Sequence, residues 1–219
     1  MQFKPVVPIS FFDPEVEFGE GTLNGRVALT GGFAFGMLVR TGITRTLSLE
    51  TGISQIRRNY EWELVNDTSG FQAKDRIRYI GYEIPVNLLV YIRLGERTFM
   101  NAALGASVDM YPSDAVRAVE LGRAFWYRNG WVQAGAVGNM GVEYRTDKSG
   151  IIYLGATYHR AFGDMAISQL TYYSRELVPY AIQRGISGSY LTVDLRYFFH
   201  EDPDRTRVRR QRRKRGGDQ

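Results

Sequence analysis

Nine ionisable side chains occupy alternating positions in stretches that are otherwise strongly apolar. They are Arg40, Glu50, Glu83, Arg93, Asp109, Glu143, His159, Asp194 and Arg196. Acids and bases placed together in this way form ion pairs, carry ions or protons along a path, or act in acid–base catalysis. The chain has no Cys and only two His, so thiol chemistry is excluded and we predict no metal site.

The sequence gives little support for nucleophilic catalysis. An outer-membrane lipid deacylase needs a Ser activated by a His, and the pattern His-x-Ser would be its local sign. His159 is instead followed by Arg160 and Ala161, and His200 by Glu201 and Asp202. We therefore predict no catalytic residues, no cofactor and no enzymatic activity. A lipid-modifying enzyme, similar to a lipid A deacylase, is kept as the alternative.

The segment Tyr79–Arg93 shows how these charges must be positioned. Every second residue from Ile80 to Ile92 is apolar, whereas the intervening positions include Glu83, Asn87 and Arg93. Side chains of a strand point alternately to opposite faces, so one face is wholly apolar and the other is mixed. An apolar face of this length suits a tilted strand that crosses a membrane.

The same alternation recurs along the chain and predicts eight strands. They are Phe3–Phe12, Val27–Val39, Leu47–Ile53, Tyr79–Arg93, Met100–Met110, Val132–Tyr144, Ile152–Tyr158 and Leu191–Phe199. A water-soluble sandwich or barrel has its charges outside and its apolar residues inside. A charge facing lipid at mid-depth costs about 2–4 kcal/mol, so we place the apolar faces toward lipid.

The charges then line a narrow lumen. The predicted network contains Arg40, Glu50, Glu83, Arg93, Asp109, Glu143, Asp194 and Arg196. Because an eight-stranded barrel is about wide enough for side chains alone, we expect a plug of salt bridges. A proton or ion path is the alternative, and His159 is expected in the lumen or at its rim.

Short and long connections alternate between the predicted strands. The short ones are 41–45, 94–97 and 146–150, and the long ones are 13–25, 61–76, 112–129 and 163–187. This is typical of barrels with tight periplasmic turns and larger outer loops. The predicted fold class is all-β: an eight-stranded antiparallel up-and-down transmembrane β-barrel with short periplasmic turns, long extracellular loops and both termini in the periplasm.

The long connections are rich in aromatic residues. Some of these are expected in the belt at the headgroup level. The alternative is a candidate binding surface for a partner or glycan, made of Trp62, Phe125, Trp126, Tyr127 and Trp131. The stretch MAISQLTYY is expected to extend the seventh strand or to form a short strand above the membrane.

The C-terminal tail is strongly basic. Residues 1–200 are predicted to form the barrel domain and 201–219 a flexible periplasmic tail, with Arg205, Arg207, Arg209, Arg210, Arg212, Arg213, Lys214 and Arg215. In the periplasm such a tail would contact anionic lipid, cell wall or an acidic partner, or remain solvated. We expect no nucleic acid partner. The first residues, MQFKPVVPISFF, do not read as a signal peptide, so a mature form is expected.

Five strand sequences point to a known family: LSLETGIS (47–54), YEIPVNLLVYIRLG (82–95), NAALGASVDMY (101–111), AGAVGNMGVEYR (134–145) and LGATYHRAFGDM (154–165). They resemble strands of the PorT-like small outer-membrane β-barrels of Bacteroidota. SYLTVDLRYFF (189–199) is similar to the aromatic-ended last strand that barrel-assembly machinery recognises. Chains of this family often end at that aromatic residue, whereas this chain continues.

The predicted function follows from location more than from chemistry. We expect an integral outer-membrane barrel with a structural or partner-binding role, for example as a subunit of a larger envelope or secretion assembly. Its expected partners are outer-membrane lipid, lipopolysaccharide and other envelope proteins. A soluble ligand-binding barrel ranks third, behind the lipid-modifying enzyme.

Overall fold

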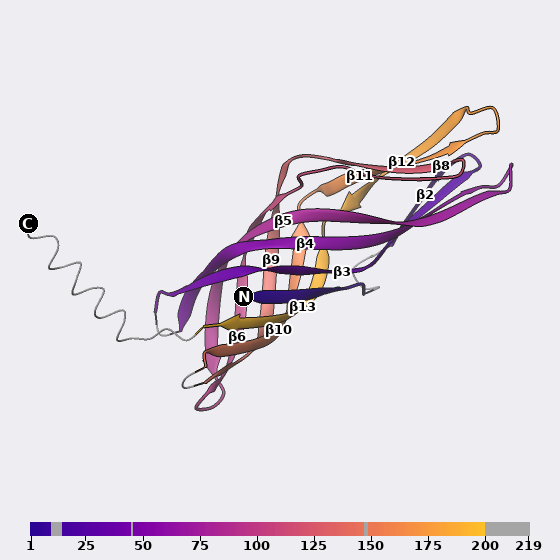
Figure 1. The fold of residues 1–219 in the computed structure, drawn as a ribbon. Helices are drawn as coiled ribbons and strands as arrows, with labels where there is room; N and C mark the ends of the chain where they lie inside the picture. Colours follow the sequence, from indigo (N-terminus) through magenta and orange to yellow (C-terminus); the bar gives the residue numbers. More distant parts are fainter. Residues whose placement is uncertain (10–14, 45, 147–148, 200–219) are drawn as a thin grey trace, which may run out of the picture.

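The computed structural model describes residues 1–9, 15–44, 46–146 and 149–199 (Figure 1). Within these residues the chain forms strands β1 to β13, and it contains no helix that is long and apolar enough to cross a membrane. Strand formation follows from the alternation of side chains, because β-branched and aromatic residues fit a pleated surface that is buried on one face.

Eight strands close into a ring. In ring order they are β1 (Gln2–Val7), β13 (Tyr190–Phe198), β10 (Ile151–Ala161), β9 (Val132–Arg145), β6 (Thr98–Met110), β5 (Phe71–Arg93), β4 (Leu47–Asn66) and β3 (Leu23–Gly42), and β3 pairs back to β1. Every neighbouring pair is antiparallel, and ring order follows chain order. The predicted fold class, an eight-stranded antiparallel up-and-down barrel, is confirmed.

The first predicted strand is shorter than expected. The predicted range is Phe3–Phe12, but β1 ends at Val7, directly before Pro8. Proline has no N–H to donate to a neighbouring strand, so pairing stops there. Residues 10–14 lie outside the described part of the chain.

Short connections join β3 to β4, β5 to β6 and β9 to β10, and we call their side of the barrel the turn end. At the opposite end the prediction of long loops is wrong, because most of these segments form β-strands. Strands β3, β4 and β5 have 20, 20 and 23 residues, about twice what a bilayer crossing needs. Five shorter strands lie beside them: β2 (Glu15–Glu20), β7 (Ala115–Val119), β8 (Gly122–Arg128), β11 (Asp164–Tyr173) and β12 (Pro179–Ser187).

We call this projecting part, residues 15–29, 58–79, 112–130 and 163–188, the extension (Figure 1). In it β2 pairs with β3, and β12, β11, β8 and β7 form a separate four-stranded sheet. The expected short strand in MAISQLTYY is confirmed as β11. The long β3 passes from ring to extension at a bulge between Leu29 and Gly31, where Gly31 has a φ of 134°. Glycine adopts this φ without strain, so it accommodates the bulge.

The polarity of the buried face inverts along single strands. In the ring part of β4, Ser48, Glu50 and Ser54 are buried, whereas Leu49 and Ile53 are exposed. In the extension the buried residues of the same strand are Trp62 and Leu64. The interior of the ring is therefore polar, and the interior of the extension is apolar.

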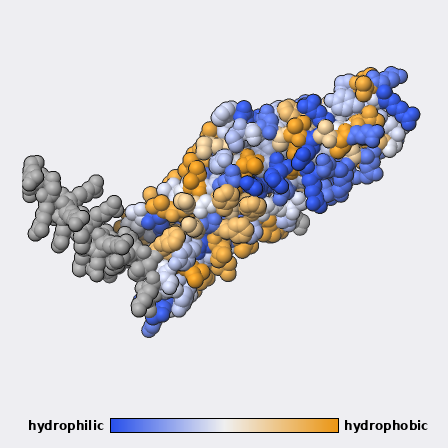
Figure 2. Space-filling model, viewed as in Figure 1, coloured by the Kyte–Doolittle hydropathy of each residue, from blue (hydrophilic) through white to orange (hydrophobic). Residues whose placement is uncertain are grey.

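Exposed apolar side chains surround the ring. This apolar belt consists of Phe35, Met37, Val39, Leu49, Ile53, Val86, Leu88, Val90, Ile92, Leu104, Val108, Met140, Val142, Ile152, Leu154, Val193 and Leu195. Figure 2 shows hydrophobic side chains gathered over the ring and hydrophilic ones prevailing over the extension. Soluble monomers rarely expose a continuous apolar surface of this extent, and the predicted transmembrane form of the barrel is confirmed.

Candidate functional site: the charged barrel interior

Three arginines and three carboxylates fill the ring near the turn end. This arginine cluster consists of Arg40, Glu50, Glu143, Arg145, Asp194 and Arg196. Glu50 accepts hydrogen bonds from Arg40 at 2.8 Å and from Arg196 at 2.7 Å. Glu143 accepts from Arg40 at 2.8 Å, and Asp194 accepts from Arg196 at 2.5 Å. The predicted plug of salt bridges is present, and its formal charges sum to zero.

Neutral side chains add hydrogen bonds to the arginine cluster, in which Arg196 Nε alone of the described buried side-chain atoms has no partner. Asp194 also accepts hydrogen bonds from Thr157 at 2.5 Å, Thr192 at 2.7 Å and Asn139 at 3.2 Å. Tyr153 donates to Asn139 at 2.8 Å. Buried ions remain stable only when their lone pairs and protons are bonded in this way. The arrangement holds the barrel closed and offers no vacant carboxylate for a ligand.

A second cluster lies deeper, toward the extension. This histidine cluster consists of Glu83, Ser107, Asp109, His159 and Tyr190. Glu83 on β5 pairs directly with Asp109 on β6, and His159 on β10 pairs directly with Tyr190 on β13. The His159 ring is stacked on Tyr190 with 4.8 Å between centroids, and the hydroxyl of Tyr190 donates to Glu83. The strand pairing therefore places the two carboxylates, Glu83 and Asp109, opposite the imidazole of His159.

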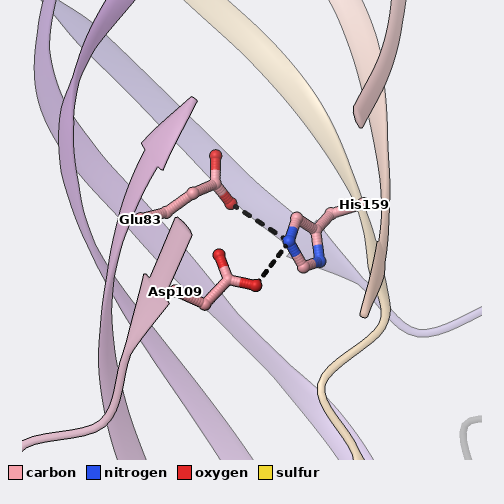
Figure 3. Close-up of side chains that lie close together, drawn as sticks. All are labelled: Glu83, Asp109 and His159. Carbon is pink, nitrogen blue, oxygen red and sulfur yellow. Dashed lines mark ion pairs between the residues drawn. The ribbon is translucent and has the colours of Figure 1, made fainter. Parts of the chain in front are cut away.

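Both carboxylates point at the same ring nitrogen (Figure 3). His159 Nε2 lies 2.9 Å from Asp109 Oδ2 and 3.9 Å from Glu83 Oε2. Neither Asp109 Oδ2 nor His159 Nδ1 has a hydrogen-bond partner among the described residues. The short distance to Asp109 is therefore a close contact without hydrogen-bond geometry. The histidine cluster is less completely bonded than the arginine cluster.

Two buried cations face the histidine cluster from other strands. Lys4 Nζ on β1 lies 4.0 Å from Glu83 Oε1. Arg58 on β4 stacks over the Tyr190 ring at 4.8 Å and donates to the Gly188 carbonyl at 3.1 Å. These two positive charges balance the two carboxylates, which are otherwise a like-charged pair on adjacent strands.

The histidine cluster could also hold a metal ion. One ligand atom each from Glu83, Asp109 and His159 lies within 4.8 Å of the others, and all three residues are buried. One imidazole and two carboxylates suit Zn²⁺ or a similar divalent ion. Such an ion would compete with Lys4 for Glu83. The prediction of no metal site is based on the small number of His residues. It does not consider that Glu83 and Asp109, from other strands, could join His159 as ligands.

A serine also contacts His159. Ser107 Oγ lies 2.9 Å from Nε2, although 52 residues separate the two. A local His-x-Ser pattern could not reveal this pair. In a Ser-His-Asp triad the serine and the carboxylate contact different ring nitrogens. Here Ser107 and Asp109 contact the same one, so the geometry is not that of a triad.

The remaining predicted residues divide between buried and exposed positions. Arg93 is a correction: it is exposed near the turn end, where its Nε donates to the Gly95 carbonyl at 2.9 Å, so it does not belong to the interior network. The prediction that Trp62 and Trp126 belong to an aromatic binding surface is wrong, because both side chains are fully buried in the core of the extension. Trp131 is exposed, and Arg128 stacks over it at 4.5 Å. Phe125 and Tyr127 are half-buried neighbours on β8.

The basic tail, from Arg205 to Arg215, lies outside the described residues. The same holds for the proposed boundary of the barrel domain at residue 200, so the division into barrel and tail stays a prediction.

Comparisons with known proteins add one distant likeness. No family model matches the chain, and no curated protein matches it. Among solved structures, the outer membrane protease OmpT from Escherichia coli is similar, with 14% sequence identity and a TM-score of 0.45. The match covers 81% of this chain, which spans 66% of the length of that chain. The resemblance to PorT-like barrels stays a prediction.

The expectation that this protein is not an enzyme is corrected. The similar solved structure is that of an outer membrane protease. The likeness gives no argument about the reaction, the substrate or the residues of this chain.

Proposed function

We propose that the protein is an integral outer-membrane barrel of the bacterial envelope that binds a partner through its extension. The apolar belt around a charge-filled interior is the observation that carries the first half of this proposal. In this arrangement the short turns and both termini lie in the periplasm, and the extension stands outside the cell. The strand sequences that resemble PorT-like barrels agree with a place in a larger envelope assembly.

The tip of the β11–β12 hairpin supports partner binding. Leu177 and Val178 are 72% and 44% exposed there, beside a half-exposed Tyr180. Leu177 also has a positive φ of 60°, which is strained for a leucine. Apolar side chains at the tip of a water-exposed projection, one of them in a strained turn, favour a contact surface for another protein.

The test uses the full chain purified from native membranes in mild detergent. The double variant Leu177→Asn, Val178→Thr removes the apolar tip, and asparagine fits a positive φ better than leucine, so folding is retained. The control is Val116→Thr, at an exposed apolar position on β7. We expect a stoichiometric envelope protein with the native chain and the control and not with the tip variant. A native chain that comes alone contradicts partner binding.

Membrane residence is tested separately. The native chain is expected to stay in the membrane fraction through alkaline carbonate washing and to require detergent for extraction. Release by carbonate would contradict the barrel's place in the membrane, whatever the partner result.

A hydrolase that modifies lipid is the second candidate. The contact between Ser107 Oγ and His159 Nε2 supports it, and the buried location and the missing partner at Nδ1 weigh against it. A fluorophosphonate probe is expected to label Ser107 if the serine is activated. Absence of labelling in the native chain, or equal labelling of Ser107→Ala, would eliminate this candidate.

A further inference from the structure

A hollow on the outer surface collects three arginines without any carboxylate. It is lined by residues of four strands: Thr30 at the bulge of β3, Asn59 on β4, Arg76, Ile77 and Arg78 on β5, and Arg117 on β7. Arg76, Arg78 and Arg117 are all exposed. We call it the arginine hollow.

None of these three guanidinium groups forms an ion pair within the described part of the chain, although the charge of Arg76 contributes to the lowered pKa of Glu61. Glu61 lies opposite Arg76 in the pairing register, but its carboxylate bonds to Lys74 at 2.7 Å. That hydrogen bond from Lys74 is the main reason that the pKa of Glu61 is lowered. Arg78 has only a long hydrogen bond, 3.4 Å, to the amide oxygen of Asn59. Three unpaired cations around one hollow repel each other, and an anion would relieve the repulsion.

The outward face of β5 indicates where the arginine hollow lies relative to the hydrocarbon core of the membrane. This face runs from Val90 and Val86 in the apolar belt through Tyr82 and Ile80 to Arg78 and Arg76. Arg78 is two positions from Ile80, which is about 7 Å along the strand and less along the membrane normal because the strand is tilted. Lipid headgroups occupy roughly the first 5–7 Å beyond the hydrocarbon core on each side.

We infer that the arginine hollow binds the phosphate of a phosphorylated glycolipid in the outer leaflet. Arginine guanidinium groups match phosphate with paired hydrogen bonds, which suits them better than lysine for this purpose. Thr30 and Asn59 offer neutral polar groups for the sugar, and the acyl chains lie along the apolar belt on β5. This inference rests on the proposed insertion in the outer membrane.

The probe is lipid A with two phosphates, added to the delipidated full chain in mild detergent and followed by native mass spectrometry. The test variant is Arg76→Gln, Arg78→Gln, Arg117→Gln. The control, Arg123→Gln, Arg175→Gln, Arg184→Gln, removes the same charge from exposed cations of the extension outside the hollow. A hydrogen bond between charged groups is worth about tenfold or more in affinity, so the test variant should bind roughly 100-fold more weakly and the control like the native chain.

Three outcomes would overturn the inference. Dephosphorylated lipid A binding as tightly as the bisphosphorylated form would show that phosphate is not recognised. Inorganic phosphate competing at concentrations similar to the lipid would indicate a site for free anions. Equal weakening in the test and control variants would indicate general electrostatic attraction.

A single variant guards against a folding defect. Arg117→Gln changes only the short strand β7, and it should weaken binding about tenfold while heat-modifiable migration on gels stays native. Unchanged affinity would remove Arg117 from the site and count against the hollow. Failure of this inference in a chain that still needs detergent leaves the membrane proposal intact, so the two failures are distinguishable.

Discussion

Glu50 is the residue on which the arginine cluster depends, because Arg40 and Arg196 both bond to it. Replacing it with Gln leaves two buried guanidinium groups without their shared counterion. Removing one partner from a buried ion pair costs about 3–5 kcal/mol. We predict a loss of this size for Glu50→Gln, measured as the free energy of unfolding by urea in detergent.

The matched control is Glu15→Gln in the extension. Glu15 accepts hydrogen bonds from Arg26, which lower its pKa, but the pair is exposed to water. Exposed pairs contribute little, so this variant should unfold like the native protein. Equal stability of Glu50→Gln and the native chain would contradict the view that the interior charges form one closed network.

Gly155 makes room for the Tyr153 ring, which leans over it and over Gly141 opposite. A methyl group at Gly155 would collide with that ring and with the Met140 carbonyl. The ring must then leave Asn139 and the Arg196 guanidinium, over which it is stacked. We predict that Gly155→Ala destabilises the barrel by about 1–3 kcal/mol, seen as a lower midpoint of thermal unfolding.

Gly138→Ala provides the comparison on a neighbouring strand. A Cβ there would meet no atom within 4 Å, so its unfolding midpoint should stay unchanged. A stable Gly155→Ala variant would mean that Tyr153 is free to move, and that the ring is no fixed part of the interior.

At the scale of the strand, the apolar belt sets the cost of a misplaced charge. Leu154 is 60% exposed on β10, between Val142 and Leu195 on the neighbouring strands. An arginine there faces hydrocarbon and should cost about 2–4 kcal/mol. We predict that Leu154→Arg lowers the fraction of chains that fold into lipid vesicles.

An arginine on the extension should be tolerated. Ala181 on β12 is exposed to water, so Ala181→Arg is expected to fold into vesicles like the native chain. Equal folding of Leu154→Arg and Ala181→Arg would show that the belt does not face lipid.

The strands also explain which predictions are right. In the ring, apolar residues alternate with charged ones, and this pattern predicts the eight strands and most of the lumen charges. In the extension the rule reverses: on β4, Trp62 and Leu64 face inward while Glu61 and Glu63 face outward. The predicted strands are bounded by apolar residues on the outward face. In the extension the outward face becomes polar, so this criterion ends each strand too early and predicts loops there. Arg93 is misplaced because β5 leaves the lumen near its last residue.

The histidine cluster is only partly predictable. Glu83 and Asp109 each lie on the polar face of their strand, and the alternation of side chains predicts that this face points into the lumen. Their approach to His159 depends on how far each strand slides past its neighbours, and spacing within one strand does not report that slide. The arginine hollow escapes prediction for the same reason, because Arg117 reaches it from a separate sheet.

The whole molecule consists of two filled compartments in line. Buried ions fill the ring, and a core that includes Trp62, Trp126 and Leu170 fills the extension. Because side chains of the described residues fill both compartments, we predict no steady ion conductance when the native chain is inserted in a planar bilayer. Repeated current steps of constant size would contradict a closed interior.

The pairing of β1 with β13 has a consequence for biogenesis. Phe3 lies opposite Leu195, so the cylinder closes only when the first and last strands meet. Such distant pairing is slow, because a long loop must be ordered before the contact stabilises it. Until the last strand is in place, β1 and β10 present unsatisfied edges that invite association with other chains. Newly made protein therefore needs shielding from its neighbours for as long as that final seam stays open.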